Sequence, residues 1–161
     1  MAPMYRHQPL KSQRSIRVFS ILPSRDCKAP IQGTLSEVNL DSNPLFEALS
    51  YVWGRPEPGN AVTILTLSIG GAEKASSCLD VTPNCLSALK TLRLRFKPRK
   101  LWIDAICIDQ NSIPEKSQQV PLMTEIYGGG QTRPGVVEYR KREQEASSAD
   151  FTINPQCGMA L

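Results

Sequence analysis

The residues best suited to chemistry in this chain are carboxylates that stand among apolar residues. Asp104 interrupts an apolar run that extends from Leu101 to Ile108. A carboxylate in the middle of such a run costs several kcal/mol unless it is paired or hydrogen-bonded. Two interpretations stay open: Asp104 binds a ligand or takes part in catalysis, or it only accepts hydrogen bonds from the backbone of a neighbouring loop.

A second carboxylate, Glu47, lies in the segment Phe46–Gly54, which has the sequence FEALSYVWG. If this segment is a strand, Glu47, Tyr51 and Trp53 share one face, because successive side chains alternate. Glu47 has no obvious partner on this apolar face, so a functional and a structural role both stay open. We therefore group Glu47 with Asp104 around one shared pocket.

Polar residues also follow directly after the apolar run, at Asp109 and Gln110. Open α/β sheets bind their ligands at the carboxyl ends of the strands, which makes both residues candidates for ligand contact. The alternative for Asp109 is a turn, because Asp–Gln–Asn–Ser is typical turn and cap sequence.

Composition excludes several classes of site. The 161 residues fit one domain, and the net charge of +4 comes without a long basic tract, zinc-ligand spacing or RNA-binding signature, so we expect no metal site and no nucleic-acid partner. His7 is the single histidine, which excludes Ser–His–Asp and Cys–His catalysis unless a partner supplies the imidazole.

Five cysteines without a CxxC pair favour a reducing compartment. With no signal peptide and no membrane-spanning run, the expected location is the cytoplasm, without a membrane partner.

Hydrophobic patterning alternates between strands and helices. It predicts strands over Ser15–Leu22, Ile31–Leu40, Phe46–Gly54, Val62–Ile69, Leu79–Val81 and Leu101–Ile108, the first two as an N-terminal hairpin. It predicts one helix from Pro83 to Pro98, with Thr82 as N-cap, and a second from the Ser112–Glu115 capping box to about Tyr127. Pro121 falls inside the second helix, so that helix either kinks there or begins later.

The apolar stripe of the first helix comprises Cys85, Leu86, Leu89, Leu92 and Phe96, and we assign it to core packing. The chain divides into a polar leader over residues 1–12, a domain over residues 13–127 and a divergent tail over residues 128–161. The tail is rich in glycine and charge, which predicts disorder with at most a short helix around Val137–Ala146.

Three blocks of sequence together resemble the fungal heterokaryon incompatibility (HET) domain. They are Glu47–Gly54 (EALSYVWG), Leu101–Gln110 (LWIDAICIDQ) and Glu115–Tyr127, with its pattern E-K-x-x-Q-V-x-x-M-x-x-I-Y. Two features depart from the family pattern: Asp109 replaces the usual Asn, and no A-x-x-V-x-V-W-L-G strand follows Tyr127. The resemblance therefore covers roughly residues 13 to 127 and implies a domain truncated after about residue 127, with the next strand missing.

The resemblance implies an α/β fold with a mixed, mainly parallel sheet flanked by helices, similar to Toll/interleukin-receptor-type (TIR-like) domains, with an incomplete C-terminal part. It implies an effector of fungal non-self recognition and cell death that works by self-association or with other signalling proteins. Two alternatives stay open: a glycohydrolase-like enzyme acting on NAD or another nucleotide, and an inactive truncated fragment. In the enzyme alternative NAD is a substrate, and the resemblance implies no cofactor.

In the enzyme alternative, Glu47 and Asp104 are the catalytic carboxylates, since cleavage of a ribosyl bond passes through an oxocarbenium-like transition state that a carboxylate stabilises. The residues that line the ligand are then Ser50, Tyr51, Trp53, Gly54, Trp102, Asp109, Gln110 and Glu115. Several have structural alternatives: the two tryptophans as core anchors, Glu115 as the partner in the capping box, and Gly54 as a turn residue.

Overall fold

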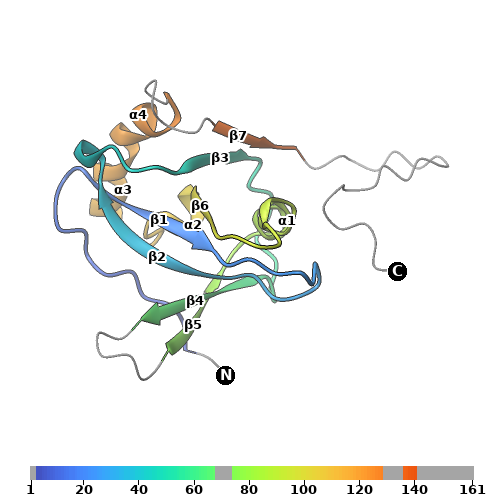
Figure 1. The fold of residues 1–161 in the computed structure, drawn as a ribbon. Helices are drawn as coiled ribbons and strands as arrows, with labels where there is room; N and C mark the ends of the chain where they lie inside the picture. Colours follow the sequence, from blue (N-terminus) through green and yellow to red (C-terminus); the bar gives the residue numbers. More distant parts are fainter. Residues whose placement is uncertain (1–2, 68–73, 129–135, 141–161) are drawn as a thin grey trace.

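A seven-stranded sheet dominates the computed structural model, which describes residues 3–67, 74–128 and 136–140 (Figure 1). The strands are β1 (Ser15–Ile21), β2 (Gln32–Asn39), β3 (Glu47–Tyr51), β4 (Ala61–Leu67), β5 (Lys74–Asp80), β6 (Arg99–Trp102) and β7 (Val136–Tyr139). They lie in the order β5-β4-β2-β1-β6-β3-β7. Gly70–Gly71, a pair typical of a hairpin turn, falls between β4 and β5 and lies outside the described residues.

Parallel and antiparallel pairings are equally represented in this sheet. Strand β1 runs antiparallel to β2 and β6, and β4 runs antiparallel to β5. The parallel pairs are β2 with β4, β3 with β6 and β3 with β7. The α/β class and the mixed sheet are confirmed, whereas the prediction of a mainly parallel sheet is wrong, because β2 and β5 each pair antiparallel with the strand that precedes them.

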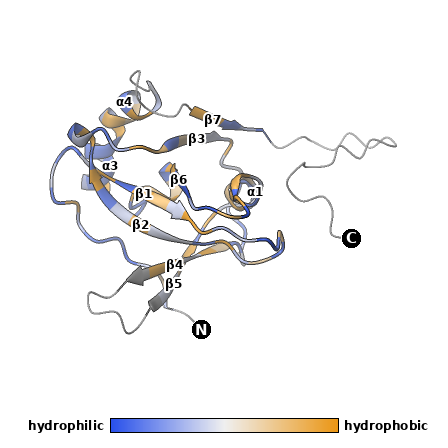
Figure 2. Cartoon of the chain, viewed as in Figure 1, coloured by the Kyte–Doolittle hydropathy of each residue, from blue (hydrophilic) through white to orange (hydrophobic). Residues whose placement is uncertain are grey.

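The core is built around the central strand β1, whose residues are buried on both faces. Ile16, Phe19 and Ile21 are fully buried there, together with Leu49 of β3 and Trp102 of β6. Apolar residues recur along β1, along β4 and along helix α1 (Pro83–Leu92), which contacts β3 (Figure 2). Apolar side chains of β1 supply most of this burial, and the polar residues Ser15 and Arg17 are buried among them.

Short helices connect and flank the strands. They are η1 (Leu40–Ser42), α1 (Pro83–Leu92), α2 (Asp104–Cys107), α3 (Ile113–Gln119), η2 (Val120–Leu122) and α4 (Met123–Gly128). Thr82 caps α1 as predicted, because its side-chain oxygen accepts the Cys85 N–H at 3.3 Å. Helix α1 packs against β3. In the described part of the chain, no helix combines the length and apolar character needed to cross a bilayer.

Two predicted elements end early. The buried strand predicted over Leu101–Ile108 stops at Trp102, and the residues from Asp104 onward form α2. Ile106 and Cys107 stay buried in that helical turn, so a continuous apolar run does not by itself distinguish strand from helix. Helix α1 ends at Leu92 instead of reaching Pro98. The prediction that Phe96 packs in the core as part of the apolar stripe is therefore wrong, and this side chain is 71% exposed.

Pro121 interrupts the second predicted helix rather than delaying it. Ser112 caps α3 by accepting the Glu115 N–H at 3.3 Å, as predicted. The helix then passes through η2, a 3₁₀ segment that contains Pro121, before α4 begins. A tighter 3₁₀ turn accommodates a residue that cannot donate the α-helical hydrogen bond. The helical pattern predicts Val120 on the buried face of this helix, but its side chain is 57% exposed, so that prediction is wrong.

A strand follows α4 where the sequence predicted none. Strand β7 pairs in parallel with β3 from Ala48 opposite Val136 to Tyr51 opposite Tyr139. The prediction of a missing strand, with at most a helix around Val137–Ala146, is wrong over residues 136–139, because Val–Val–Glu–Tyr fits a half-buried edge strand. The rest of the predicted disordered tail, residues 129–135 and 141–161, lies outside the described residues.

The polar N-terminal segment lies against the domain. Tyr5 donates its backbone N–H to the Cys78 carbonyl oxygen at 2.7 Å, which places the segment beside β5. His7 Nε2 donates to the Ile106 carbonyl oxygen at 2.8 Å and so reaches α2. The residues of the predicted polar leader therefore make regular contacts with two separate elements.

Candidate functional site

Asp104 and Trp53 meet at the carboxyl ends of two neighbouring strands. Strands β3 and β6 run parallel, so the residues that follow them emerge at the same edge of the sheet. The Trp53 indole N–H donates to Asp104 Oδ2 at 2.9 Å, and Asp104 Oδ1 accepts the Ala105 N–H at 2.8 Å. The hydrogen bond between Trp53 and Asp104 directly joins the EALSYVWG block to the LWIDAICIDQ block.

The Asp104 carboxyl is half-buried, and burial raises its pKa above the ordinary value of 3.8. The Trp53 hydrogen bond and the backbone N–H of Ala105 act in the opposite direction but do not outweigh burial. A raised pKa is typical of a carboxyl group that donates or accepts a proton during a reaction. The backbone hydrogen bond expected in the structural interpretation is present, although its donor is the next residue, Ala105. The carboxyl group also lies beside Trp53, which is 41% exposed, and a ligand-binding role for Asp104 stays a prediction.

Gly54 is required by the turn that positions Trp53. Its φ of +73° lies in the left-handed region, and a Cβ built there would stand 2.8 Å from Asn84 Nδ2. Asn84, in the first turn of α1, donates that amide group to the Val52 carbonyl oxygen at 3.0 Å. The glycine thus lets α1 hold the end of the EALSYVWG block by a direct hydrogen bond.

Tyr51 lies at the end of β3 with its hydroxyl oxygen buried and without a hydrogen-bond partner of regular geometry among the described residues. Burial strongly raises its pKa, with a further contribution from the neighbouring Cys85 thiol, so the phenol stays neutral. Burial also raises the pKa of Cys85 to about 12. Tyr51 therefore does not supply an exposed stacking ring, and Cys85 is not a thiolate nucleophile.

Glu47 does not join Asp104. Its carboxylate makes a two-pronged ion pair with Arg99, with Arg99 Nε at 2.5 Å from Oε2 and Nη2 at 2.9 Å from Oε1. Glu47 lies opposite Leu101 in the register, and Asp104 follows three residues later, about 10 Å farther along the strand direction. The prediction of one pocket shared by Glu47 and Asp104 is wrong, because the two lie towards opposite ends of the paired strands.

Trp102 is a core residue. It is fully buried, and its ring meets that of Tyr127 edge to face with 5.5 Å between centroids. Its indole N–H has no hydrogen-bond partner among the described residues. Trp102 is therefore a core anchor, which was the structural alternative for it. Trp53 is the tryptophan that reaches the surface.

Glu115 is engaged in a buried ion pair. Arg17 Nη1 lies 2.5 Å from Glu115 Oε1 and Arg17 Nη2 lies 2.9 Å from Oε2, with both side chains at least 90% buried. Glu115 Oε1 also accepts the Asp109 N–H at 2.8 Å. Burial opposes the charge, but Arg17 outweighs it and lowers the pKa of Glu115 below 4.5. Glu115 therefore connects β1 to α3 rather than facing a ligand.

Asp109 and Gln110 border a cavity of about 470 Å³ between α2 and the N-terminal segment. Gln110 Nε2 donates to the Asp104 carbonyl oxygen at 2.8 Å, and Asp109 Oδ1 accepts the Asn111 N–H at 3.0 Å. Arg6 and His7 of the N-terminal segment also line this cavity. Asp109 thus makes the predicted turn and also lines a cavity.

The remaining predicted residue, Ser50, is exposed on β3 opposite Glu138 of β7. The described residues contain no group of three or more His, Cys, Asp or Glu side chains arranged to hold a metal ion. Among the predicted site residues, the structure therefore joins Asp104, Trp53, Gly54 and Gln110 at one edge and places Glu47, Trp102, Glu115 and Ser50 elsewhere.

Three residues around these elements, Arg17, Asn84 and His7, were not predicted from the sequence to make these contacts. Arg17 had the same signal as Asp104, a charged residue inside an apolar run, which requires a partner. Asn84 and His7 had no such signal, because their partners are backbone carbonyl groups far away in the sequence.

Comparison with known proteins supports the assignment that the sequence blocks implied. Residues 46–155 match the family model described as "Heterokaryon incompatibility protein (HET)", a range that continues past Tyr127. The chain is 39% identical over 118 residues to "Heterokaryon incompatibility protein 6, OR allele" of Neurospora crassa, covering 70% of this chain and 17% of that protein. It is 32% identical over 102 residues to "RNA-binding protein VTS1" of the same organism, covering 59% of this chain and 16% of that protein.

The chain thus spans about a sixth of the length of these curated relatives. No solved structure matches it. The family match covers well over half of the chain and contains both segments that meet at Trp53 and Asp104. The chain belongs to the heterokaryon incompatibility (HET) protein family.

Proposed function

We propose that this chain is an effector module of fungal non-self recognition, which triggers cell death when genetically different cells fuse. The proposal is supported by membership of the HET family and by similarity to a Neurospora heterokaryon incompatibility protein. It applies to the segment shared with that relative, since the chain covers 17% of the relative's length.

The observation that carries the proposal is the hydrogen bond between Trp53 and Asp104. It links two separate sequence blocks of the family at the edge of the sheet where α/β domains place their functional groups. An exposed aromatic ring and a carboxyl group with a raised pKa form a surface that a partner or ligand can contact. We propose this edge, with Gly54 and Gln110, as the active surface of the module.

The module works, in this proposal, in the cytoplasm and through self-association or other signalling proteins. A TIR-like arrangement of strands and helices is part of the same proposal. The α/β class and the mixed sheet are compatible with it.

Asp104→Asn tests the proposal in cells. Hydrogen bonds to charged groups contribute about 1.5–3 kcal/mol, and the neutral amide can satisfy only one of the two donors that Asp104 binds. We expect the fraction of dying cells to fall about tenfold or more when the variant chain is expressed from an inducible promoter in a filamentous fungus. Uptake of a vital dye at equal protein level measures that fraction.

Glu57→Gln is the matched control, because it also neutralises one carboxylate but lies exposed in the loop between β3 and β4. Asn60 donates a hydrogen bond to the backbone carbonyl oxygen of Glu57. A change of the Glu57 side chain leaves this hydrogen bond in place. Death at the unmodified level for Glu57→Gln and its loss for Asp104→Asn support the proposal. Equal activity of both variants contradicts it, and a chain that is inert without any substitution favours the inactive-fragment alternative.

A second candidate function is cleavage of NAD or a related nucleotide. The specific observation in its favour is the position of the Asp104 carboxyl group beside the exposed Trp53 ring, because an ionised carboxylate stabilises a positively charged ribosyl group and an aromatic ring can stack on a base. Glu47 is not part of this version, because Arg99 holds it towards the other end of the strands. Release of nicotinamide by the purified chain, abolished by Asp104→Asn and not by Glu57→Gln, would support this candidate, and absence of release removes it.

A further inference from the structure

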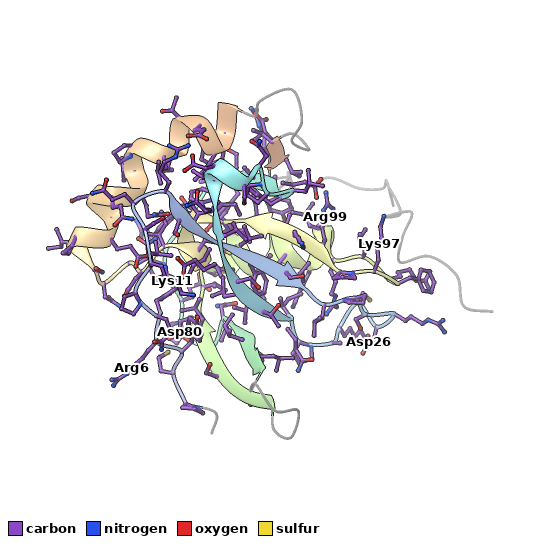
Figure 3. All side chains as sticks on the ribbon, turned by 60° about the vertical axis from the view of Figure 1, so that its left-hand side comes forward. Arg6, Lys11, Asp26, Asp80, Lys97 and Arg99 are labelled. Atoms are coloured by element: carbon purple, nitrogen blue, oxygen red, sulfur yellow. The ribbon has the colours of Figure 1, made fainter. Side chains whose placement is uncertain are left out.

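Two loops form a joint projection at one end of the sheet. The first connects β1 to β2, and the second connects α1 to β6. Ser24 in the first loop donates its N–H to the Leu94 carbonyl oxygen in the second at 3.1 Å. Asp26 and Lys97 mark these loops in Figure 3, at the end of the molecule opposite Arg6, Lys11 and Asp80.

Arg93 fixes the two loops to each other. Its buried guanidinium donates to four backbone carbonyl oxygens of the first loop, those of Asp26, Cys27, Ala29 and Pro30, at 2.8–3.1 Å. A guanidinium group with several fixed donors is well suited to organise a loop in this way. The projection is therefore preorganised rather than a pair of independent loops.

An exposed aromatic ring stands on this projection among cations. Phe96 is 71% exposed, with the Arg25 guanidinium carbon 5.1 Å and the Arg95 guanidinium carbon 5.7 Å from its ring centroid. Lys28 and Lys97 are exposed in the same two loops. We name this surface the basic tip, formed by Arg25, Lys28, Arg95, Phe96 and Lys97.

The charge of the basic tip is not neutralised by the part of the chain that the structure describes. Among the described residues, none of its four cations makes an ion pair with a carboxylate, and Arg95 Nε is buried without a hydrogen-bond partner. One acidic side chain is present, that of Asp26, whose Oδ1 accepts the Lys28 N–H at 2.8 Å. Four cations and one anion leave the tip strongly positive.

We propose that the basic tip docks on an anionic membrane surface, with Phe96 entering the interface and the cations contacting lipid headgroups. An apolar ring surrounded by cations on a projecting loop is the arrangement that combines insertion with attraction to anionic lipids. A single-stranded nucleic acid requires stacking rings along a groove that follows the backbone, whereas here the single ring already lies beside two guanidinium groups. This proposal departs from the sequence-based expectation of no membrane partner, which rested on the lack of a spanning segment.

Vesicle sedimentation with the full chain tests the proposal. We expect binding to phosphatidylcholine vesicles that contain phosphatidylserine, weak binding to pure phosphatidylcholine, and loss of binding at high salt. Each of Lys28→Gln and Lys97→Gln should weaken binding about fivefold, and Phe96→Ala should weaken it about tenfold or more. Lys11→Gln is the matched control, because it removes one exposed lysine at the other end of the molecule and should leave binding unchanged.

The same variants distinguish membrane docking at the basic tip from non-specific vesicle binding and from binding of nucleic acid. Equal binding to neutral and anionic vesicles, or equal losses for Lys11→Gln and Lys97→Gln, overturns the proposal. Lack of vesicle binding together with tip-dependent binding to a single-stranded RNA oligomer also overturns it and assigns the tip to nucleic acid. Unchanged thermal melting of Phe96→Ala, expected from its exposure, shows that any loss of binding comes from the surface.

Cys27 provides a second readout, because it is an exposed free cysteine in the first loop. An environment-sensitive dye is attached to it after Cys78 and Cys157 are replaced by serine, which leaves the buried Cys85 and Cys107. A blue shift of emission on addition of anionic vesicles, absent with Phe96→Ala, is the expected result. No shift at vesicle concentrations that sediment the protein contradicts insertion at the tip. This inference does not depend on the proposed cell-death function.

Discussion

Glu115→Gln should destabilise the domain by about 3–5 kcal/mol, the cost of breaking a buried ion pair by removing one partner. Arg17 is 5% exposed in its side chain and would keep its charge without a carboxylate to balance it. The contacts of Arg17 with the carbonyl oxygens of Cys107 and Gln8 stay in place, but neither of them carries a charge. Urea unfolding of the purified variant, compared with the unmodified chain, measures the change in the free energy of unfolding.

The double replacement Arg17→Met with Glu115→Leu is the control for this prediction. Removing both charges avoids the unpaired guanidinium, so the double variant should be more stable than Glu115→Gln alone. A free energy of unfolding for Glu115→Gln within about 1 kcal/mol of the unmodified chain, the usual range for exposed pairs, would contradict the buried pair.

The same ion pair gives stability a defined pH dependence. The pKa of Glu115 is lower in the folded chain than its ordinary value of 4.5, because Arg17 outweighs the effect of burial. The folded state therefore binds fewer protons at this group, and its contribution to stability is present above pH 4.5 and is lost as the pH falls through the lowered pKa. In Glu115→Gln this loss in acid should be absent. Asp104 acts with the opposite sign, since its pKa is raised.

Trp102→Ala should cost about 3–5 kcal/mol, which is the usual penalty for truncating a buried tryptophan. The side chain is fully buried on β6 and meets the Tyr127 ring at an interplanar angle of 90°. Since the stability of a domain of this size is about 5–15 kcal/mol, much of it depends on this one side chain. Thermal and urea unfolding of the variant measure the loss.

Trp102→Phe distinguishes the core role from the ligand-binding role predicted from sequence. Phenylalanine keeps an aromatic ring for the contact with Tyr127 and removes the indole N–H that has no partner among the described residues. We therefore expect Trp102→Phe to recover most of the stability that Trp102→Ala loses. A Trp102→Ala variant that unfolds like the unmodified chain but loses activity would instead place Trp102 in the site.

Features specified by neighbouring residues were predicted from the sequence. Thr82 followed by Pro83, and Ser112 followed three residues later by Glu115, marked the starts of α1 and α3 because capping depends on residues within one turn. The strands β1 and β2 also followed from local patterning.

Features specified by distant residues were not predicted. The partner of Glu47 is Arg99, and the partner of Glu115 is Arg17, which is 98 positions away in the sequence. Strand register brings Glu47 on β3 close to Arg99 on β6, and the packing of α3 against β1 brings Glu115 to Arg17. Register and packing are properties of the whole fold. The surroundings of Asp104 were also not predicted. They depend on its position at the start of α2, and a continuous apolar run in the sequence does not show where a helix starts.

The most direct test of the central claim, that Trp53 and Asp104 join the two sequence blocks, is NMR of the tryptophan indole N–H groups across a pH titration. Trp53→Phe assigns the two signals, since the chain contains two tryptophans. The hydrogen bond to Asp104 predicts that the Trp53 signal shifts with a midpoint above 3.8, the ordinary Asp pKa, and that Asp104→Asn abolishes this titration. A Trp53 signal that does not respond to pH, or that responds equally in Asp104→Asn, would contradict the claim.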